Sequence, residues 1–519
     1  MAVDAVEHEA GGKGLKTGAL GLVAVVVIGV ASTAPGYSLA ASLGGVSGAV
    51  GLKAPAIMWM AFIPMGCIAA AYFYLNKADP DCGTTFTWVT RAMGPKTGWF
   101  GGWGIVLADL VIMPNLAGIS GQYVFLLFGK KALAADVVWT TALGCVFIMA
   151  MSWICVVGIE LSARTQVGLL GTEVVVLVLF SIISMYKVFS DHPKGSVTPT
   201  LSWLVPTGFN SSAMAAGLVL AVFIYWGWDT AVSVNEECED SSRTPGIAAV
   251  VSTVLLLLIY VVVTFGAQAY AGSDFLANST DVLNDVGALV FGGGFFGTLM
   301  QKLLIISVLT SAAASCQTTI LPAARSALSM GVHGAAPKKL AEMDRRHLTP
   351  GFATWLFGVI ACLWYVGLQL ITSQTDTNAY GASIAAVGIM IAFYYGLTGY
   401  ACIVYYWKHI FTSAKNFVFV GLLPLIGSGV LTWVLVKTLR DSYDTAYQSL
   451  GGLFGVGTVF VIGVGLLILG IPLMLVWRAR APRFFTFRRD PVGLRPDPDG
   501  NGGPAPVLGE IVKAGSNVR

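Results

Sequence analysis

Charged residues are scarce in this chain: only 11% of its 519 residues are charged, while 56% are hydrophobic. Soluble domains carry about 25% charged residues, so the composition excludes an ordinary soluble protein. The net charge of +3 is too small to suggest a nucleic-acid partner. The eight cysteines lie in apolar runs or in loops expected to face the cytoplasm, so we expect no disulfide framework.

Basic side chains are missing from the middle of the apolar runs, and the five histidines lie in tails, loops or run ends. No Walker motif, His/Cys ligand cluster or nucleophile–base set occurs in the sequence. We therefore expect no enzyme activity, no metal site and no cofactor. The first apolar run is also too long to be a cleavable signal peptide.

Long apolar runs fill most of the chain, and about 20 apolar residues suffice to cross a bilayer. Twelve such runs occur, at 17–52, 54–76, 97–128, 137–159, 165–186, 195–240, 244–273, 303–324, 351–375, 377–407, 416–436 and 445–477, and the sixth span uses only the part from about 211 onward. If both termini are cytoplasmic, 22 of the 30 Lys and Arg residues fall on the cytoplasmic side, as the positive-inside rule requires. We predict an all-α, multi-pass protein of the cytoplasmic (inner) membrane with twelve transmembrane helices.

The first and sixth runs are interrupted in their middle, at matching places in the two halves. Five spans per half would invert the second half relative to the first, which is the inverted-repeat design of many transporters. The expected organisation is a cytoplasmic tail (1–15), a first five-helix repeat (16–190), a second repeat (210–410), two further helices (415–480) and a disordered cytoplasmic tail (481–519).

The first interruption reads Ser32-Thr33-Ala34-Pro35-Gly36. Unwound backbone at this depth leaves several N–H groups free at the start of a half-helix, which is a preformed anion site. A substrate carboxylate would fit it. The alternative is a proline kink in an ordinary span.

The second interruption reads Phe223-Ile224-Tyr225-Trp226-Gly227-Trp228-Asp229. Aromatic rings at mid-depth can close over a solute or bind a cation, although some of these rings are expected to serve packing alone. Phe223 and Trp226 are the better candidates for substrate contact, because they stand just before Gly227, where the backbone opens.

Only three ionisable side chains lie well inside the spans: Asp109, Glu173 and Asp229. Intramembrane acids are costly and usually functional. Burial disfavours the charged carboxylate, which suits a group that binds and releases a proton, so all three are candidates for coupling. The alternative is a neutral carboxyl that hydrogen-bonds to a neighbouring helix for structural reasons.

Two further polar groups stand out. Arg91 lies in an expected cytoplasmic loop, and Glu236 and Glu237 end the sixth run; these charges could pair in a cytoplasmic gate or form a solvated end. The second group is a set of hydroxyls in the eighth run, which we expect near the first interruption and which could serve close helix packing: Ser307, Thr310, Ser311 and Ser315.

Two motifs occur in order: Gly83-Thr84 through Gly94-Pro95, then Tyr225-Trp226-Gly227-Trp228-Asp229-Thr230-Ala231 with Asn235-Glu236-Glu237. In this arrangement the chain resembles the amino acid–polyamine–organocation permeases, over about residues 17–478, and we expect a bacterial source. The resemblance implies a leucine-transporter-like fold, in which spans 1, 2, 6 and 7 form a bundle against a scaffold of spans 3, 4, 5, 8, 9 and 10.

The resemblance also implies site roles. The solute's carboxylate would meet Ser32, Thr33, Ala34 and Gly36, and its amino group the carbonyls of Phe223, Ile224, Tyr225 and Trp226. Asp229 falls where several relatives place an acid near the substrate amine. In sodium-coupled relatives, hydroxyls in the place of the eighth-run set, Ser307, Thr310, Ser311 and Ser315, help to hold an ion. The chain departs from the pattern at Ser-Thr-Ala-Pro-Gly, where Gly-Ser/Thr-Gly is commoner, and at Glu173, where several relatives carry a lysine.

We therefore expect a secondary transporter of an amino acid or related small amine that works by alternating access, most simply as a proton symporter, with sodium as the other candidate ion. Three buried acids and many aromatics suit a polyamine or monoamine importer as the alternative, and solute exchange is a third mode. A membrane sensor with a transporter fold is the alternative from another class, which the short tails disfavour.

Overall fold

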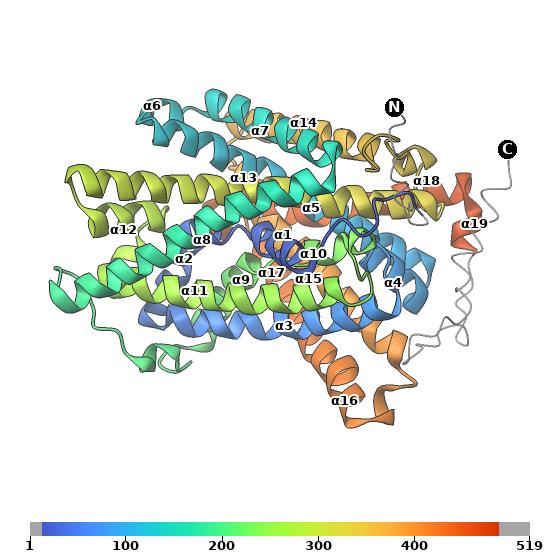
Figure 1. The fold of residues 1–519 in the computed structure, drawn as a ribbon, viewed down its shortest axis with the longest axis horizontal. Helices are drawn as coiled ribbons and strands as arrows, with labels where there is room; N and C mark the ends of the chain where they lie inside the picture. Colours follow the sequence, from blue (N-terminus) through green and yellow to red (C-terminus); the bar gives the residue numbers. More distant parts are fainter. Residues whose placement is uncertain (1–12, 487–519) are drawn as a thin grey trace, which may run out of the picture.

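The computed structural model of the chain describes residues 13–486, and helices make up nearly all of its regular structure (Figure 1). Its two strands, β1 (Gly452–Leu453) and β2 (Val456–Gly457), form one short antiparallel hairpin. The all-α prediction is confirmed. The helices are α1 Leu22–Ser32, α2 Pro35–Val50, α3 Ala54–Ala78, α4 Thr85–Met93, α5 Pro95–Leu127, α6 Lys131–Ala134, α7 Val137–Val157, α8 Ile159–Ser190, α9 Ser211–Ile224, α10 Thr230–Ser233, α11 Thr244–Ala277, α12 Val282–Phe291, α13 Gly294–Val332, α14 Gly351–Gln374, α15 Ala379–Tyr406, α16 Ala414–Asn416, α17 Leu423–Ser442, α18 Thr458–Arg480 and α19 Pro482–Phe485.

Within the described residues, ten helical stretches are long and apolar enough to cross a membrane, and the first of them, Leu22–Ala78, contains α1, α2 and α3. Two shorter apolar helices, α9 and α12, accompany them. The long helices run along the longest axis of the molecule, with α4 and α19 at one end and α6 and α12 at the other (Figure 1). The protein is thus a multi-pass membrane protein, while the count of twelve spans and the five-plus-five division remain predictions.

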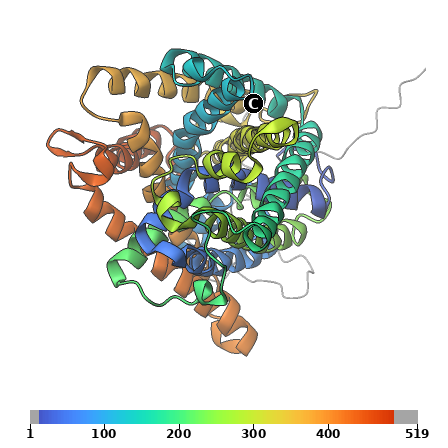
Figure 2. The same cartoon turned by 90° about the vertical axis from the view of Figure 1, so that its left-hand side faces the viewer.

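The helices that contain the two interruptions lie toward the middle of the molecule. The end-on view shows the blue and green segments there, with the orange-red segments of α17 and α18 on one flank (Figure 2). In this centre α2 packs against α9 and α11, and α1 packs against α10 and α11. Around it α5 packs along α13, and α8 packs against both α11 and α13. The interruptions are therefore enclosed by helices, as unwound backbone in a membrane requires.

Both interruptions are real breaks in the helices. Ala34 adopts a left-handed conformation (φ +47°) between α1 and α2, and Pro35 opens α2, where its missing N–H costs nothing. The second break separates α9, which ends at Ile224, from α10, which begins at Thr230. Gly227 lies between them with φ +117°, a conformation that favours glycine.

The two ends of the described chain differ from the sequence prediction. The expected tail 1–15 is described only from Lys13, and Leu15 is fully buried beside Cys82 and Leu328. The expected tail 481–519 begins instead with α19, because Phe484 and Phe485 bury their rings in a cluster with Phe86, Trp99 and Met474. A few apolar side chains suffice to dock a segment, and the tail boundaries themselves remain predictions. Residues 1–12 and 487–519 lie outside the described residues.

Candidate functional site

The first break is tied to both neighbouring parts of the molecule. The Ser32 carbonyl accepts a hydrogen bond from the Ser315 hydroxyl of α13 at 2.7 Å, and the Ser32 hydroxyl lies 2.8 Å from that of Thr230 in α10. The Thr33 hydroxyl donates to the Val30 carbonyl. Ser32 therefore joins the first break to α13 on one side and to the second break on the other.

The Glu173 side chain of α8 lies against the N-terminus of α2. Its Oε1 accepts a hydrogen bond from the Gly36 backbone N–H at 2.6 Å and from the Ser311 hydroxyl of α13 at 2.8 Å. The same Ser311 oxygen accepts the Tyr37 N–H at 3.2 Å. Glu173 is fully buried, and its Oε2 has no hydrogen-bond partner among the described residues. One carboxyl thus connects α8, α13 and the start of α2.

The expectation that several backbone N–H groups are free at the first break is wrong. The N–H groups of Thr33 and Ala34 bond to carbonyls one turn earlier in α1, and the N–H of Ser38 bonds to the Ala34 carbonyl. Pro35 has no N–H, and the remaining donors face Glu173 and Ser311. The sequence could not show this, because the carboxylate that accepts from Gly36 comes from a helix 137 residues away.

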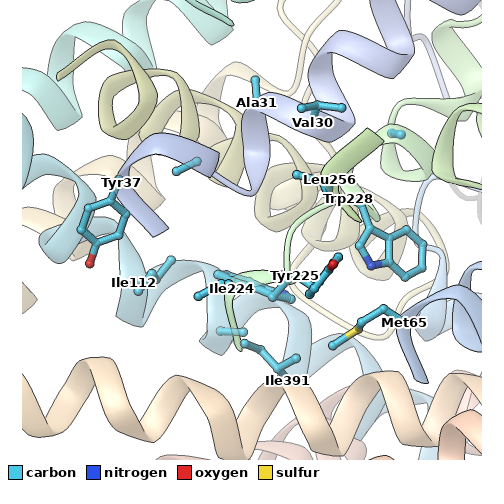
Figure 3. Packing of buried hydrophobic residues seen from close by; sticks show 14 of the residues in the cluster. Val30, Ala31, Tyr37, Met65, Ile112, Ile224, Tyr225, Trp228, Leu256 and Ile391 are labelled. Carbon is cyan, nitrogen blue, oxygen red and sulfur yellow. The ribbon is translucent and has the colours of Figure 1, made fainter. Parts of the chain in front are cut away.

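The second break touches the first. A methyl group added at Gly227 would lie 2.7 Å from the Ser32 carbonyl oxygen, so only glycine allows this close approach of the two backbones. Before Gly227 the chain places Ile224 and Tyr225, whose side chains lie with Trp228 in the apolar packing between the breaks (Figure 3). The Ile224 carbonyl already accepts a hydrogen bond from the Tyr260 hydroxyl at 2.5 Å.

Asp229 is held by two adjacent tyrosines of α15. Its Oδ2 accepts from the Tyr394 hydroxyl at 3.0 Å and its Oδ1 from the Tyr395 hydroxyl at 2.7 Å. The Trp226 indole N–H in turn donates to the Tyr394 oxygen at 2.5 Å. This acid is therefore built into a hydrogen-bonded group that links the second break to α15.

Asp109 of α5 lies apart from that hydrogen-bonded group. It is buried, its Oδ2 has no hydrogen-bond partner among the described residues, and it interacts with Asp229 electrostatically. The three intramembrane acids thus divide into Glu173 at the first break and the pair Asp229 and Asp109 near the second.

Two cavities meet at the breaks. A small one of about 20 Å³ lies against both breaks, room for about one water molecule. Its lining residues are Ser32, Thr33, Ala34, Tyr37, Ser38, Ile112, Leu116, Phe223, Trp226 and Ser315. A larger one of about 350 Å³ extends from Tyr37 and Phe223 toward Gln448, between α2, α5, α9, α15 and α17. Tyr37 and Phe223 line both cavities and so stand at their boundary.

The opposite end of the molecule is closed by buried ion pairs. Lys13 Nζ lies 2.7 Å from Asp81 and 2.6 Å from Glu236, and it approaches the Cys82 sulfur at 3.6 Å. We call this end the Lys13 face. Burial alone would raise the pKa of Asp81, but Lys13 and His333 hold it well below its usual range. Asp81, Cys82 and Glu236 are close enough to share a cation, and the Lys13 ammonium fills that role.

Arg91 does not pair with Glu236 or Glu237, which was one of the two arrangements considered for these charges. Arg91 lies 2.8 Å from Asp79, its neighbour across the α3–α4 connection. Glu237 instead forms a two-point hydrogen bond with Arg325 of α13 at 2.6 and 2.8 Å. Asp81, Glu236 and Glu237 therefore pair with bases from distant segments, Lys13 and Arg325, while Asp79 pairs with a base close to it in the sequence.

Several residues of these networks escaped sequence analysis. Tyr394 and Tyr395 sit in an apolar run where tyrosine is unremarkable. Arg325 and Lys13 lie at a run end and in the expected N-terminal tail, where the sequence alone predicts a solvated charge. Of the four hydroxyls predicted near the first break, Ser311 and Ser315 contact the region around it, while Ser307 and Thr310 bond to carbonyls of their own helix.

Comparison with known proteins gives the family. The model of the amino acid permease family matches residues 20–453. The branched-chain amino acid permease BcaP of Bacillus subtilis is 23% identical over 388 residues, which cover 69% of this chain and 77% of that protein. The low-affinity putrescine importer PlaP of Escherichia coli K12 is 24% identical over 373 residues, which cover 70% and 78%.

Two further relatives extend the comparison. The vacuolar cationic amino acid transporter 4 of Arabidopsis thaliana is 24% identical over 309 residues, which cover 56% of this chain but 49% of the plant protein, so this match spans about half its length. The crystal structure of MhsT in complex with L-phenylalanine superposes with a TM-score of 0.59 at 16% identity, covering 79% of this chain and 98% of MhsT. The predicted leucine-transporter-like fold is confirmed, and the chain belongs to the amino acid permease family of membrane transporters.

Proposed function

We propose that this permease accumulates an amino acid or a related small amine by alternating access, driven by proton symport with Glu173 as the proton carrier. The observation that carries the proposal is the bond from the Gly36 N–H to Glu173 at 2.6 Å. It joins α2, which would belong to the moving bundle, to α8, which would belong to the scaffold. A buried acid at such a junction can control the junction by its charge.

Proton uptake would act through the strength of this contact. An ionised carboxylate accepts stronger hydrogen bonds from backbone N–H groups than a neutral carboxyl does, and it also faces the positive end of the α2 dipole. Protonation of Glu173 would therefore loosen α2 from α8 and α13. Deprotonation would draw α2 back, so the charge on one side chain would bias the position of the bundle. Asp229 and Asp109 are the rival carriers.

The cavities support an alternating-access cycle. The 350 Å³ cavity approaches the breaks from one end, while buried ion pairs close the other. We assign the Lys13 face to the cytoplasm, with both termini there, because its basic residues follow the positive-inside rule. Arg91, Glu236 and Glu237 would then belong to the cytoplasmic closure, and opening inward would require their ion pairs to break.

The substrate would bind between the two breaks, against Ser32, Thr33, Ala34 and Gly36 on one side and Phe223, Ile224, Tyr225, Trp226 and Gly227 on the other. Asp229 lies close by, held by Tyr394 and Tyr395. The similarity to a branched-chain amino acid permease and to a putrescine importer supports this range of solutes. A solute carboxylate could reach the Gly36 N–H only by displacing Glu173.

That occupancy favours a second candidate: an amine without a carboxylate. The donors at the first break already serve Glu173 and Ser311, while Asp229 and the aromatic rings beside it suit a cation. Such a solute could bind without displacing Glu173 from the first break. The ligand panel described next distinguishes an amino acid substrate from an amine substrate.

The deciding experiment uses purified protein in liposomes with an imposed pH gradient. Thermal stabilisation across a panel of amino acids, monoamines and polyamines first identifies the ligand, and uptake of that ligand is then measured with the gradient on, with it collapsed, and with a sodium gradient alone. Accumulation that follows the pH gradient supports the proposal. Accumulation that follows sodium, or exchange that ignores both gradients, would contradict it, and a sodium dependence would direct attention to Ser311 and Ser315.

A further inference from the structure

A basic pocket of about 500 Å³ lies at the edge of the Lys13 face, away from both breaks. Its walls are the end of α7, the first turn of α8, the segment 345–348 and Lys16. The residues that line it are Lys16, Val157, Gly158, Ile159, Glu160, Leu161, Arg164, Arg345, Arg346, His347 and Leu348. Neither the proposed transport mechanism nor the closure of the Lys13 face uses it.

The pocket carries an excess of positive charge. Arg164, Arg345 and Arg346 form no ion pair within the described residues, and all three are exposed. Two acids lie nearby, but each faces another base: Glu160 lies 2.8 Å from Lys16, and Asp344 lies 3.1 Å from the His347 ring. Three arginines and Lys16 therefore line one concave surface that holds a single carboxylate, that of Glu160.

The shape of the pocket is built by the fold. Gly158, with φ +145°, turns the chain between α7 and α8, so the first turn of α8 forms one wall and adds the positive end of a 32-residue helix. The opposite wall is held in place, because the Thr349 hydroxyl donates to the Val156 carbonyl at 2.8 Å. The Asp344 carboxylate also accepts the backbone N–H groups of Arg346 and His347 at 2.9 and 2.8 Å.

The position of the pocket relative to the membrane selects its ligand. It lies at the ends of α7 and α8, two of the helices able to cross a membrane. Leu161 in its lining is apolar and 39% exposed, and Trp153 and Val167, farther along these helices, are 54% and 49% exposed. A ligand in the pocket would therefore have a phosphate-binding rim on one side and a surface for acyl chains on the other.

We propose that this pocket binds the headgroup phosphate of an anionic phospholipid. Arginine pairs with phosphate through two parallel hydrogen bonds, and basic pockets between membrane helices bind anionic headgroups. Free inorganic phosphate offers the same oxygens but could not use the adjoining apolar surface. The lipid's chains would lie along Leu161 and Val167 while its phosphate contacts the three arginines.

The test measures lipid binding to the purified full-length protein in a neutral detergent, by native mass spectrometry and by thermal shift. The probes are dioleoylphosphatidylglycerol, dioleoylphosphatidylcholine and inorganic phosphate. We expect phosphatidylglycerol to bind at least about fivefold more tightly than phosphatidylcholine and to raise the melting temperature. A triple variant, Arg164→Gln, Arg345→Gln and Arg346→Gln, should lose that preference.

Matched variants keep the test sharp. Arg478 and Arg480 are exposed at the end of α18 and lie outside the pocket, so Arg478→Gln with Arg480→Gln should leave the preference unchanged. A variant with lysine at the three arginine positions keeps the charge of the unaltered protein. It should therefore retain part of the preference for phosphatidylglycerol that the triple glutamine variant loses. An unaltered preference in the triple variant would overturn the proposal. So would an equal loss in the α18 variant, or phosphate stabilisation that phosphatidylglycerol does not exceed.

Discussion

Glu173 is the side chain on which the proposed coupling depends. We predict that Glu173→Gln, which resembles the protonated form, still binds and exchanges substrate but loses pH-driven accumulation by at least about tenfold. The amide can still accept the Gly36 N–H, yet it can no longer change charge. Counterflow and gradient-driven uptake in liposomes separate the two activities. If the variant accumulates substrate with an unchanged pH dependence, the carrier is Asp229, Asp109 or no side chain.

A substitution at Gly36 tests the hydrogen bond between Gly36 and Glu173 from the side of α2. A methyl group added there would lie 3.2 Å from Glu173 Oε1, closer than most side chains tolerate, so Gly36→Ala should push the carboxyl away from the α2 N-terminus. We expect weaker coupling, seen as uptake that depends less on the pH gradient. Gly48→Ala is the control on the same helix, because its methyl would meet only Ala277 at 3.6 Å. Equal effects of the two changes would indicate a general loss of helix packing.

At the scale of single residues, the helix breaks and the importance of the buried acids could be predicted from the sequence, because each interrupts an apolar pattern. Asp109, Glu173 and Asp229 are conspicuous among hydrophobic neighbours, and Pro35 and Gly227 cannot continue a regular helix. Their partners could not be predicted. Which donor faces which carboxyl depends on how helices far apart in sequence pack, so the contact of Glu173 with Gly36 needs the fold.

Among the elements, the segment that carries Lys13 is the most informative. We predict that Lys13→Gln opens the Lys13 face, because it leaves two nearly buried carboxylates without their shared cation, a change that typically costs 3–5 kcal/mol. Cys82 supplies a built-in reporter: it is fully buried 3.6 Å from Lys13 Nζ, and burial raises the pKa of its thiol. Labelling of Cys82 by a thiol reagent should be slow in the unaltered protein and several-fold faster in the variant.

Two controls accompany that measurement. Cys82→Ser shows which part of the labelling belongs to this thiol. Lys16→Gln removes the neighbouring base, whose partner Glu160 is 47% exposed, and should leave the rate unchanged because surface pairs contribute little. A Lys13→Gln protein with an unaltered Cys82 rate would show that the segment is not part of the closure.

Asp79, at the end of α3, gives a pH prediction. Burial raises its pKa to about 6, although Arg91 lies beside it. Between about pH 4 and 6 the folded protein keeps a proton that the unfolded chain has lost, so this carboxyl stabilises the fold at low pH and loses that effect as pH rises through 6. The melting temperature of the unaltered protein minus that of Asp79→Asn should therefore fall between pH 5 and pH 7.

A difference that stays constant between these pH values would contradict the assignment. Asp441→Asn is the control, because Asp441 forms a half-buried pair with Lys437 one helical turn earlier, away from Asp79 in the sequence.

For the molecule as a whole, the proposed cycle predicts which end admits solute first. Ala385 lines the 350 Å³ cavity, so a cysteine placed there by Ala385→Cys should react with a membrane-impermeant thiol reagent from the outside of intact cells, and transported solute should protect it. Cys82 at the opposite end should stay unlabelled in the same cells. Labelling of Ala385→Cys only after the cells are broken would reverse the proposed orientation.

The global architecture was the most predictable level. Apolar run length and charge asymmetry indicate a multi-pass helical protein, because a bilayer imposes both, and the motif order indicated the family. The short elements at the chain ends were missed. The docking of Leu15, Phe484 and Phe485 depends on a surface that exists only once α4, α5 and α13 are assembled.

The Lys13 ion pairs also bear on how the protein is made. Lys13 leaves the ribosome 223 residues before Glu236 and 316 residues before Ser329, its partners in the folded molecule. During synthesis the early segment must therefore wait, with its charge in water, while α1 to α13 enter the membrane. Until α13 has been synthesised, the chain lacks part of the contacts that hold Lys13 in the folded molecule.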